Sequence, residues 1–256
     1  MLLAVDIGNT NVAVGIFQEE TLVEHWKVRS DAEKTCDEYK VILRGLLRAS
    51  HLEEAQIKGA ILSSVVPPLT PVFQELCRGM FQIKPLTVGP GLKTGMPIMY
   101  ENPLEVGADR VASAVASLER YGGPCIVVDF GTATTFDALS AQGEYLGGAI
   151  APGVRISAEA LYTKTAKLPR IEIVRPERAI GRTTVTSMQS GLYYGYIGLV
   201  SSLIQRFLDE LGGEAAVVAT GGFASLVHRE VSSIGHYEPD LVLEGLRILY
   251  ERNRKN

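Results

Sequence analysis

Apolar and polar residues alternate along the start of the chain and predict three consecutive strands. These strands cover residues 2–6, 12–17 and 22–28, and a period of two is the pattern of a strand with one buried face. Next come a predicted helix near residues 37–49, a buried strand over 59–66, a helix over 69–80 and a short strand over 86–88. The order βββαβαβ indicates a mixed sheet with helices packed on it.

The pattern of three strands returns in the second half of the chain. Strands are predicted over residues 126–129, 134–139 and 144–150, and later over 215–219. Helical patterns occur over residues 154–162, within 183–211, and near 223–231 and 239–252. This repetition predicts an α/β protein of two lobes, residues 1–120 and residues 121–256.

One side of the long helical pattern carries small residues at spacings of four, three and four: Gly191, Gly195, Gly198 and Ser202. Such a row lets two helices approach closely. We therefore expect close helix packing here, either within the chain or across a dimer.

A short acidic motif, Asp6-Ile7-Gly8-Asn9-Thr10-Asn11, joins the first two predicted strands. Gly8 lets the backbone approach an anion closely, and the polar side chains that follow add hydrogen-bond donors beside the backbone N–H groups. Asp6 repels phosphate, so it would act through Mg²⁺, directly or through water. Taken alone, however, the motif favours a simple hairpin turn.

A second copy of the motif changes this interpretation. Val128-Asp129-Phe130-Gly131-Thr132-Ala133 repeats Val5-Asp6-Ile7-Gly8-Asn9-Thr10, and the two aspartates are 123 residues apart (129 − 6). Again an apolar run precedes the motif and an alternating run follows it. Two matching hairpins, one opening each half, predict a duplicated domain. Two phosphate loops that face each other would hold one nucleotide from both sides.

Two further motifs follow at the ends of predicted elements. An irregular segment, residues 89–101, leads to a helix whose start is predicted at Asn102, with Gly107-Ala108-Asp109-Arg110 in its early turns. A glycine inside a helix costs about 1 kcal/mol relative to alanine, so something is expected to approach Gly107 closely. By spacing alone, Asp109 and Arg110 are a surface charge pair. Thr220-Gly221-Gly222 ends a strand and suits either adenosine or a plain strand-to-helix turn.

Composition excludes several classes of protein. Apolar residues make up 46% and charged residues 21% of the 256 residues, as in ordinary globular proteins. The net charge of −4 gives no basic surface for nucleic acid, and no apolar run is long enough for a membrane span. Three scattered cysteines favour a reduced cytosol. The basic residues Arg252, Arg254 and Lys255 are expected to form a solvated tail.

The four motifs together resemble those of the type III pantothenate kinases. Asp-x-Gly-Asn-Thr, Gly-Ala-Asp-Arg, Asp-x-Gly-Thr-Ala and Thr-Gly-Gly occur in this order, and the resemblance covers essentially the whole chain. The first, third and fourth motifs resemble the wider acetate kinase, sugar kinase, chaperone and actin superfamily. The Gly-Ala-Asp-Arg motif, Gly107 to Arg110, resembles the type III pantothenate kinases more specifically.

The resemblance implies a duplicated ribonuclease H-like, actin-like fold with ATP in a cleft between the lobes. It also implies transfer of the γ-phosphoryl group of ATP to pantothenate, the first step toward coenzyme A. Proteins of this family are typically cytoplasmic homodimers. The expected ligands are ATP, Mg²⁺, pantothenate and a monovalent cation, K⁺ or NH₄⁺.

The resemblance also assigns roles to single residues. Eight residues would bind the ATP phosphates: Asp6, Ile7, Gly8, Asn9, Thr10, Asn11, Val12 and Ala13. Six would bind pantothenate: Tyr100, Gly107, Ala108, Asp109, Arg110 and Thr184. Asp109 would accept the proton of the pantothenate hydroxyl. Thr184 would close the pantothenate site from the partner subunit, Thr132 would bind ATP, and Asp129 would bind the monovalent cation.

Physical arguments support a kinase independently of the resemblance. The sequence lacks a Gly-x-x-x-x-Gly-Lys-Ser/Thr loop, so metal ions must supply most of the positive charge that phosphoryl transfer requires. A carboxylate with a pKa near ~4 is a weak base for an alcohol, so Asp109 would orient the hydroxyl and take its proton late. Arg110 could pair with the pantothenate carboxylate or steady Asp109.

Two alternative functions use the same motifs. The chain could be another small-molecule kinase of the superfamily, acting on a sugar or a carboxylate. It could also be an ATP-binding regulator or an actin-like assembly protein without kinase activity. Gly107 to Arg110 argues for the pantothenate kinase.

Overall fold

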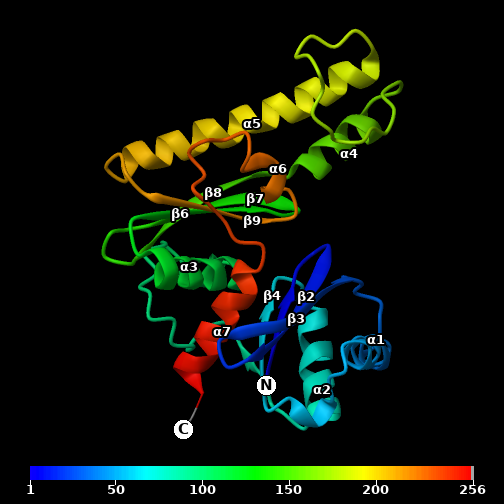
Figure 1. The fold of residues 1–256 in the computed structure, drawn as a ribbon, viewed down its shortest axis with the longest axis vertical. Helices are drawn as coiled ribbons and strands as arrows, with labels where there is room; N and C mark the ends of the chain where they lie inside the picture. The colour runs from blue at the N-terminus through cyan, green and yellow to red at the C-terminus, as the bar shows by residue number, and fades with distance from the viewer. Residues whose placement is uncertain (255–256) are drawn as a thin grey trace. The chain divides into compact units, whose positions relative to one another are not determined.

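The computed structural model describes residues 1–254, which fall into two compact units (Figure 1). Unit 1 comprises Met1–Arg120 and Asp240–Asn256, and unit 2 comprises Tyr121–Pro239. Lys255, predicted to lie in a solvated tail, is outside the described residues. None of the helices within residues 1–254 combines the length and apolar character that crossing a bilayer requires.

The sheet of unit 1 has the strand order β3-β2-β1-β4-β5. Its strands are β1 (Leu2–Ile7), β2 (Asn11–Gln18), β3 (Thr21–Arg29), β4 (Gly59–Ser64) and β5 (Leu86–Thr87). The first three form antiparallel pairs, whereas β4 runs parallel to β1 and β5 runs parallel to β4. These strands match the alternating runs of the sequence closely.

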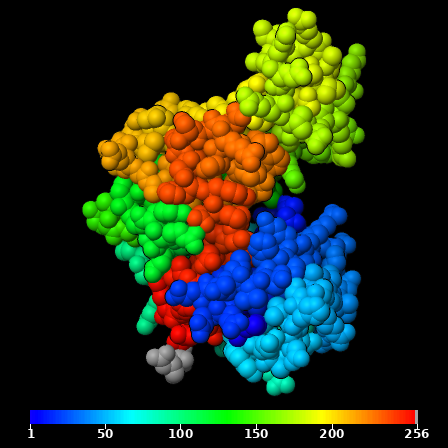
Figure 2. All heavy atoms as spheres, viewed as in Figure 1, coloured from blue at the N-terminus to red at the C-terminus, as the bar shows by residue number. Residues whose placement is uncertain are grey.

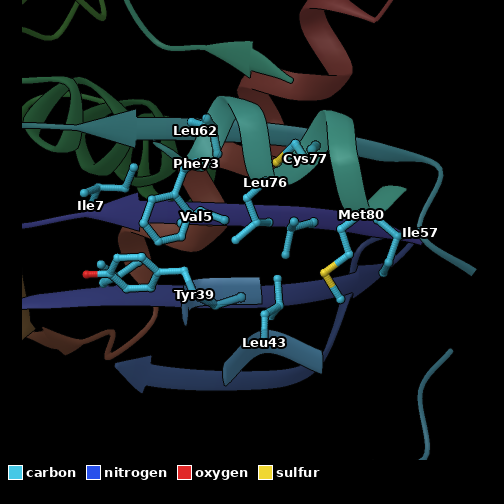
Figure 3. Close-up of a cluster of buried hydrophobic side chains, with 14 of the residues drawn as sticks. Val5, Ile7, Tyr39, Leu43, Ile57, Leu62, Phe73, Leu76, Cys77 and Met80 are labelled. Atoms are coloured by element: carbon cyan, nitrogen blue, oxygen red, sulfur yellow. The ribbon is translucent and has the colours of Figure 1, made fainter. Parts of the chain in front are cut away.

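Two helices cover one face of this sheet and bury the odd-numbered residues of β1. They are α1 (Cys36–Ala49), which begins with a capping box between Thr35 and Glu38, and α2 (Leu69–Phe81). Figure 3 shows Tyr39 and Leu43 of α1 meeting Phe73 and Leu76 of α2 beside the strands, within a contiguous apolar core. This core sets the register of β1 and β4 because a slip of one residue would turn their apolar side chains outward.

The C-terminal helix α7 (Leu241–Asn253) packs on the opposite face of the same sheet, against β1, β2 and β4. Leu243 lies beside Gly15 of β2, and the Tyr250 ring lies over Gly59 of β4. Residues 240–254 therefore belong with unit 1, whereas the sequence pattern grouped them with the second half. Arg252, expected in a solvated tail, instead pairs with Glu119 at 2.6 Å.

The helix predicted to start at Asn102 begins later. Asn102 caps a short 3₁₀ turn, η2 (Pro103–Glu105), through the Leu104 N–H, and α3 (Ala108–Tyr121) begins after Gly107. The carbonyl of Gly107 accepts the Val111 N–H at 3.0 Å, so Gly107 precedes the helix and is not one of its early residues. The local capping signal at Asn102 was real, but it serves a separate turn.

The sheet of unit 2 repeats the topology of the first, with the order β10-β9-β6-β7-β8. Its strands are β6 (Cys125–Phe130), β7 (Ala133–Leu139), β8 (Tyr145–Pro152), β9 (Ala216–Gly221) and β10 (His236–Tyr237). Three strands again pair antiparallel, and two more follow in parallel. The position of each strand in one unit has a counterpart in the other, which confirms the predicted duplication.

Unit 2 also carries a long helix, α5 (Thr184–Glu210), and two shorter ones, α4 (Val154–Lys164) and α6 (Ala224–Val227). The C-terminal half of α5 covers the sheet through Val200 and Ile204. Most of α4, the N-terminal part of α5 and the segment between them form an arm that projects from the sheet of unit 2, as the yellow-green part of the chain shows (Figures 1 and 2). Val154 and Ile173 anchor this arm to the core of the unit. Within the described chain, no atom outside α5 lies within 4 Å of a Cβ built on Gly191, Gly195 or Gly198.

The packing of α7 in unit 1 can be tested with a matched pair of helix glycines. A Cβ on Gly245 would overlap the carbonyl of Ala112 in α3, whereas a Cβ on Gly45 of α1 would meet nothing within 4 Å. We expect Gly245→Ala to lower the free energy of unfolding by about 1–3 kcal/mol, and Gly45→Ala to raise it by up to about 1 kcal/mol. Urea unfolding measures both, and equal effects would contradict the packing of α7 on α3.

Candidate functional site

The first hairpin places the acidic motif at one end of the sheet of unit 1. The Gly8 N–H donates to the Asn11 carbonyl at 3.0 Å, and a Cβ on Gly8 would press against the same oxygen. Asn9 and Thr10 are exposed, whereas Asp6 is partly buried between β2 and β4. The turn therefore offers polar groups to a ligand, and the carboxylate lies at its base.

The second hairpin occupies the equivalent place in unit 2. The Gly131 N–H donates to the Ala133 carbonyl at 3.1 Å, and Thr132 is exposed at the tip. Gly153 precedes α4 and packs directly on the carbonyls of Gly131 and Thr132. The sequence pattern did not indicate this contact, because Gly153 is distant from the hairpin along the chain.

The Thr-Gly-Gly motif lies beside the second hairpin. In the parallel pairing of β6 with β9, Asp129 is opposite Thr220. Gly221 has a φ of +92°, and a Cβ there would overlap the Asp129 carboxylate. The Gly222 N–H donates to the Phe130 carbonyl at 3.0 Å. Any other residue at position 221 would displace Asp129. The Asp-x-Gly-Thr-Ala and Thr-Gly-Gly motifs are therefore in direct contact.

The Gly-Ala-Asp-Arg motif forms the turn into α3 in unit 1. A Cβ on Gly107 would lie 2.5 Å from Oδ1 of Asp109 and 3.7 Å from the Val65 side chain, just beyond β4. The same Oδ1 accepts the Arg110 N–H at 2.8 Å. The side chain of Asp109 therefore folds back over Gly107, and only a glycine leaves room for it. The sequence predicted that another group approaches Gly107 closely, and in the structure this group is the Asp109 carboxylate.

Burial raises the pKa of the Asp109 carboxyl above its ordinary value, and the Arg110 N–H and charge offset only part of this effect. The interpretation of Asp109 and Arg110 as a plain surface charge pair is therefore wrong. A partly desolvated carboxylate is a stronger base than an exposed one, and perturbed groups of this kind often occur at functional sites.

The end of β4 connects the first hairpin with the Asp109 turn. β4 pairs with β1 along its length, and the Val65 N–H extends the pairing to the Ile7 carbonyl at 3.0 Å. Val65 also lies next to Gly107. Asp6 and Asp109, which are distant in sequence, thus occur on neighbouring segments of unit 1.

Tyr100 and Thr184 are the remaining predicted substrate residues. Tyr100 is partly buried in the connection between β5 and η2. Thr184 is the first residue of α5 and lines a cavity of about 950 Å³ in unit 2, together with Ser157, Leu161 and Arg182. The neighbouring hydroxyls of Thr183 and Thr186 are used in the capping box of α5, whereas Thr184 is not part of it.

The carboxylates suit metal ions that arrive with a nucleotide. Among residues 1–254, no group of three or more His, Cys, Asp or Glu side chains could enclose a metal. Asp6 and Asp129 each provide hard oxygen donors at the base of a hairpin. Mg²⁺ is commonly bound by one or two carboxylates together with phosphate oxygens and water, so this donor set fits.

Taken together, two sheets of equivalent topology, each with an acidic hairpin at the corresponding place, define a duplicated two-lobe α/β protein. A solved structure of a Baf family protein from Campylobacter jejuni shares this fold, with a TM-score of 0.62 at 18% identity over 98% of both chains. At this identity, the likeness concerns the fold alone.

Comparison with protein families narrows the class. The type III pantothenate kinase model matches residues 2–206. A type III pantothenate kinase of Moorella thermoacetica is 57% identical over 99% of this chain and 100% of its own length. One of Geobacter sulfurreducens is 54% identical over the full length of both. The chain belongs to the type III pantothenate kinase family.

The environment of Asp109 predicts how its charge affects stability. Because the pKa of Asp109 is raised in the folded protein, the folded state keeps this proton to a higher pH than the unfolded chain does. The stability that results is present at low pH and is lost as the pH rises through the folded pKa. We expect Asp109→Asn to melt above wild type at pH 7–8, and the difference to shrink toward pH ~4.

Thermal melting across this pH range measures the effect, and a rise of about 2–4 °C would correspond to about 1 kcal/mol for a chain of this size. Asp209→Asn is the control, because Asp209 is exposed on α5 and an asparagine can still accept its bond from Gln205. A difference that stays constant with pH would contradict the raised pKa of Asp109.

Proposed function

We propose that this protein transfers the γ-phosphoryl group of ATP to pantothenate and forms 4′-phosphopantothenate, the first step of coenzyme A biosynthesis. The observation that carries the proposal is the full-length match to type III pantothenate kinases. The Asp109 turn supports the proposal, because the Gly-Ala-Asp-Arg motif of the family places Gly107 in close contact with a partly buried carboxylate.

On the donor side, we assign the ATP phosphates to the first hairpin, residues 6–13, and to Thr132 of the second. Backbone N–H groups and exposed polar side chains are suited to phosphate oxygens. Thr220, Gly221 and Gly222 are assigned to adenosine. When bound, Mg²⁺ supplies neutralising charge to the phosphoryl oxygens, and Asp6 would hold it directly or through water.

On the acceptor side, Asp109 is the proposed proton acceptor for the pantothenate hydroxyl. Its raised pKa brings it closer to that of an effective general base, because proton transfer is favoured when the pKa approaches the working pH. Gly107, Ala108, Arg110 and Tyr100 would hold the substrate around this carboxylate. Arg110 either pairs with the substrate carboxylate or steadies Asp109.

We further propose a cytoplasmic homodimer in which Thr184 completes the pantothenate site of the partner subunit. The row of Gly191, Gly195 and Gly198 supports this arrangement. Because no atom from outside α5 lies within 4 Å of a Cβ at these positions in residues 1–254, close packing within the chain does not account for the row. Val185 and Ile180 are also exposed on the same arm. The cytoplasmic location is proposed from the scattered cysteines.

The direct test is a coupled ATP-consumption assay with pantothenate. We expect turnover by wild type and a fall in kcat of about 100-fold or more for Asp109→Asn, while the Kd for ATP stays within about twofold because the variant keeps the hairpins. Asp209→Asn serves as the control and should match wild type.

Other outcomes distinguish the alternatives. Turnover of a sugar or another carboxylate, but not of pantothenate, would identify a different kinase of the superfamily. ATP-dependent filaments seen by light scattering, without turnover of any acceptor, would identify an assembly protein.

The assignment of a monovalent cation to Asp129 predicts dependence on potassium. Replacing K⁺ and NH₄⁺ by Na⁺ should lower kcat at least about tenfold, equivalent to about 1.4 kcal/mol of transition-state stabilisation. Asp129→Asn should be slow in either salt and should lose the response to K⁺. Equal wild-type rates in sodium and potassium buffers would remove the cation role from Asp129.

A further inference from the structure

Ser63 is a buried polar residue in the strand next to Asp6. Its side chain is 0% exposed, and its hydroxyl has no hydrogen-bond partner among the described residues. The next residue differs, because the Ser64 hydroxyl accepts the Val66 N–H at 3.2 Å and the Thr70 hydroxyl at 2.8 Å. A buried hydroxyl that lacks a partner lowers the stability of the folded state, and such a group calls for an explanation.

The register of the sheet places Ser63 directly beside Asp6. β1 and β4 run parallel, with Asp6 opposite Ser63 and Val5 opposite Leu62. Side chains opposite each other in a sheet share a face. Val5 and Leu62 point into the core under α1 and α2, so Asp6 and Ser63 share the other face, at the carboxyl ends of their strands. Ligands of open α/β sheets bind at these ends.

The duplicated unit repeats this pairing. In unit 2, Thr220 is opposite Asp129 in the parallel pair β6 and β9, as Ser63 is opposite Asp6. Ser63 and Thr220 are both buried, and both carry a hydroxyl. A hydroxyl residue thus accompanies the aspartate of each hairpin. Thr220 belongs to the Thr-Gly-Gly motif, whereas Ser63 lies outside all four motifs.

We propose that Ser63 is a positioning residue of the phosphoryl-transfer site, a role that rests on the proposed function. In the complex with Mg²⁺ and ATP, its hydroxyl donates a hydrogen bond to the Asp6 carboxylate and holds that carboxylate toward the ligand. Groups that orient a metal-binding carboxylate from behind commonly alter metal affinity 10- to 100-fold. In the ligand-free protein the buried Ser63 hydroxyl lowers the stability of the folded state, and it gains its hydrogen bond only in the complex.

Ser117 provides a matched control. It lies in α3 of the same unit, is 0% exposed, and its hydroxyl is likewise without a partner among the described residues. It is eight residues beyond Asp109, about 12 Å along the helix. Ser63→Ala and Ser117→Ala therefore delete the same group from equally buried positions, and only the first position is beside Asp6.

The experiment compares melting temperatures of the full-length variants without ligand, with ATP and EDTA, and with ATP and excess Mg²⁺, all without pantothenate. Both variants should melt at or above the wild-type temperature when no ligand is present. The Mg²⁺ effect is the melting temperature with ATP and Mg²⁺ minus the melting temperature with ATP and EDTA. For Ser63→Ala this difference should be at most half that of wild type. For Ser117→Ala it should equal that of wild type.

Kinetics provide a second readout. The Mg²⁺ concentration for half-maximal activity should rise at least about tenfold for Ser63→Ala, with an unchanged KM for pantothenate. If wild type responds to Mg²⁺ and ATP and Ser63→Ala responds equally, the role of Ser63 is refuted and the proposed function stands. If wild type itself shows neither the thermal response nor turnover of pantothenate, the proposed function fails, and the role of Ser63 with it.

Discussion

Two aspartates, Asp109 and Asp129, are each packed against the backbone of a glycine, and the candidate site depends on this close approach. Gly107 leaves the space into which the Asp109 carboxylate folds, and Gly221 leaves the space beside Asp129. At both positions a single methyl group would displace the carboxylate. The glycines thus fix where negative charge lies, and this position decides where a cation or a hydroxyl proton can be held.

The local structure of this fold was predictable from sequence, but its long-range packing was not. The strands of both sheets followed from alternation, and the repeated Asp-x-Gly motif revealed the duplication. The placement of α7 was missed because it depends on Gly15, Gly59 and Gly245, whose missing side chains make room for contacts between distant segments. The helix start at Asn102 was wrong because a capping signal describes one turn and does not say how far the helix continues.

In the candidate site, too, local motifs were predictable from sequence and long-range contacts were not. Motifs revealed residues that are distinctive in type and spacing, such as Asp6 and Asp109. They did not reveal Gly153, which packs on the second hairpin, or Ser63, which lies beside Asp6. Each of these residues acquires its significance from a neighbour that is distant in sequence. Serine and glycine are common in strands and turns, so their identity alone carries little information.

The duplicated halves share a topology, but their acidic hairpins differ in the length and packing of the turn. Three residues, Gly8 to Thr10, join the strands of the first hairpin, whereas two residues, Gly131 and Thr132, join those of the second. The longer turn presents more polar groups. The shorter one is fixed from behind by Gly153.

Under the proposed function, an electrostatic argument accounts for this divergence. Two acidic hairpins cannot both meet a triphosphate without cations, since like charges at close range repel strongly in a partly desolvated site. A pair of identical hairpins would present identical ion sites. A site that must hold a small divalent ion and a larger monovalent ion needs two different ones, because the two ions differ in the number and rigidity of the ligands that they require. Under the proposed assignment of Mg²⁺ to Asp6 and of a monovalent cation to Asp129, the unequal turns would provide two different ion sites.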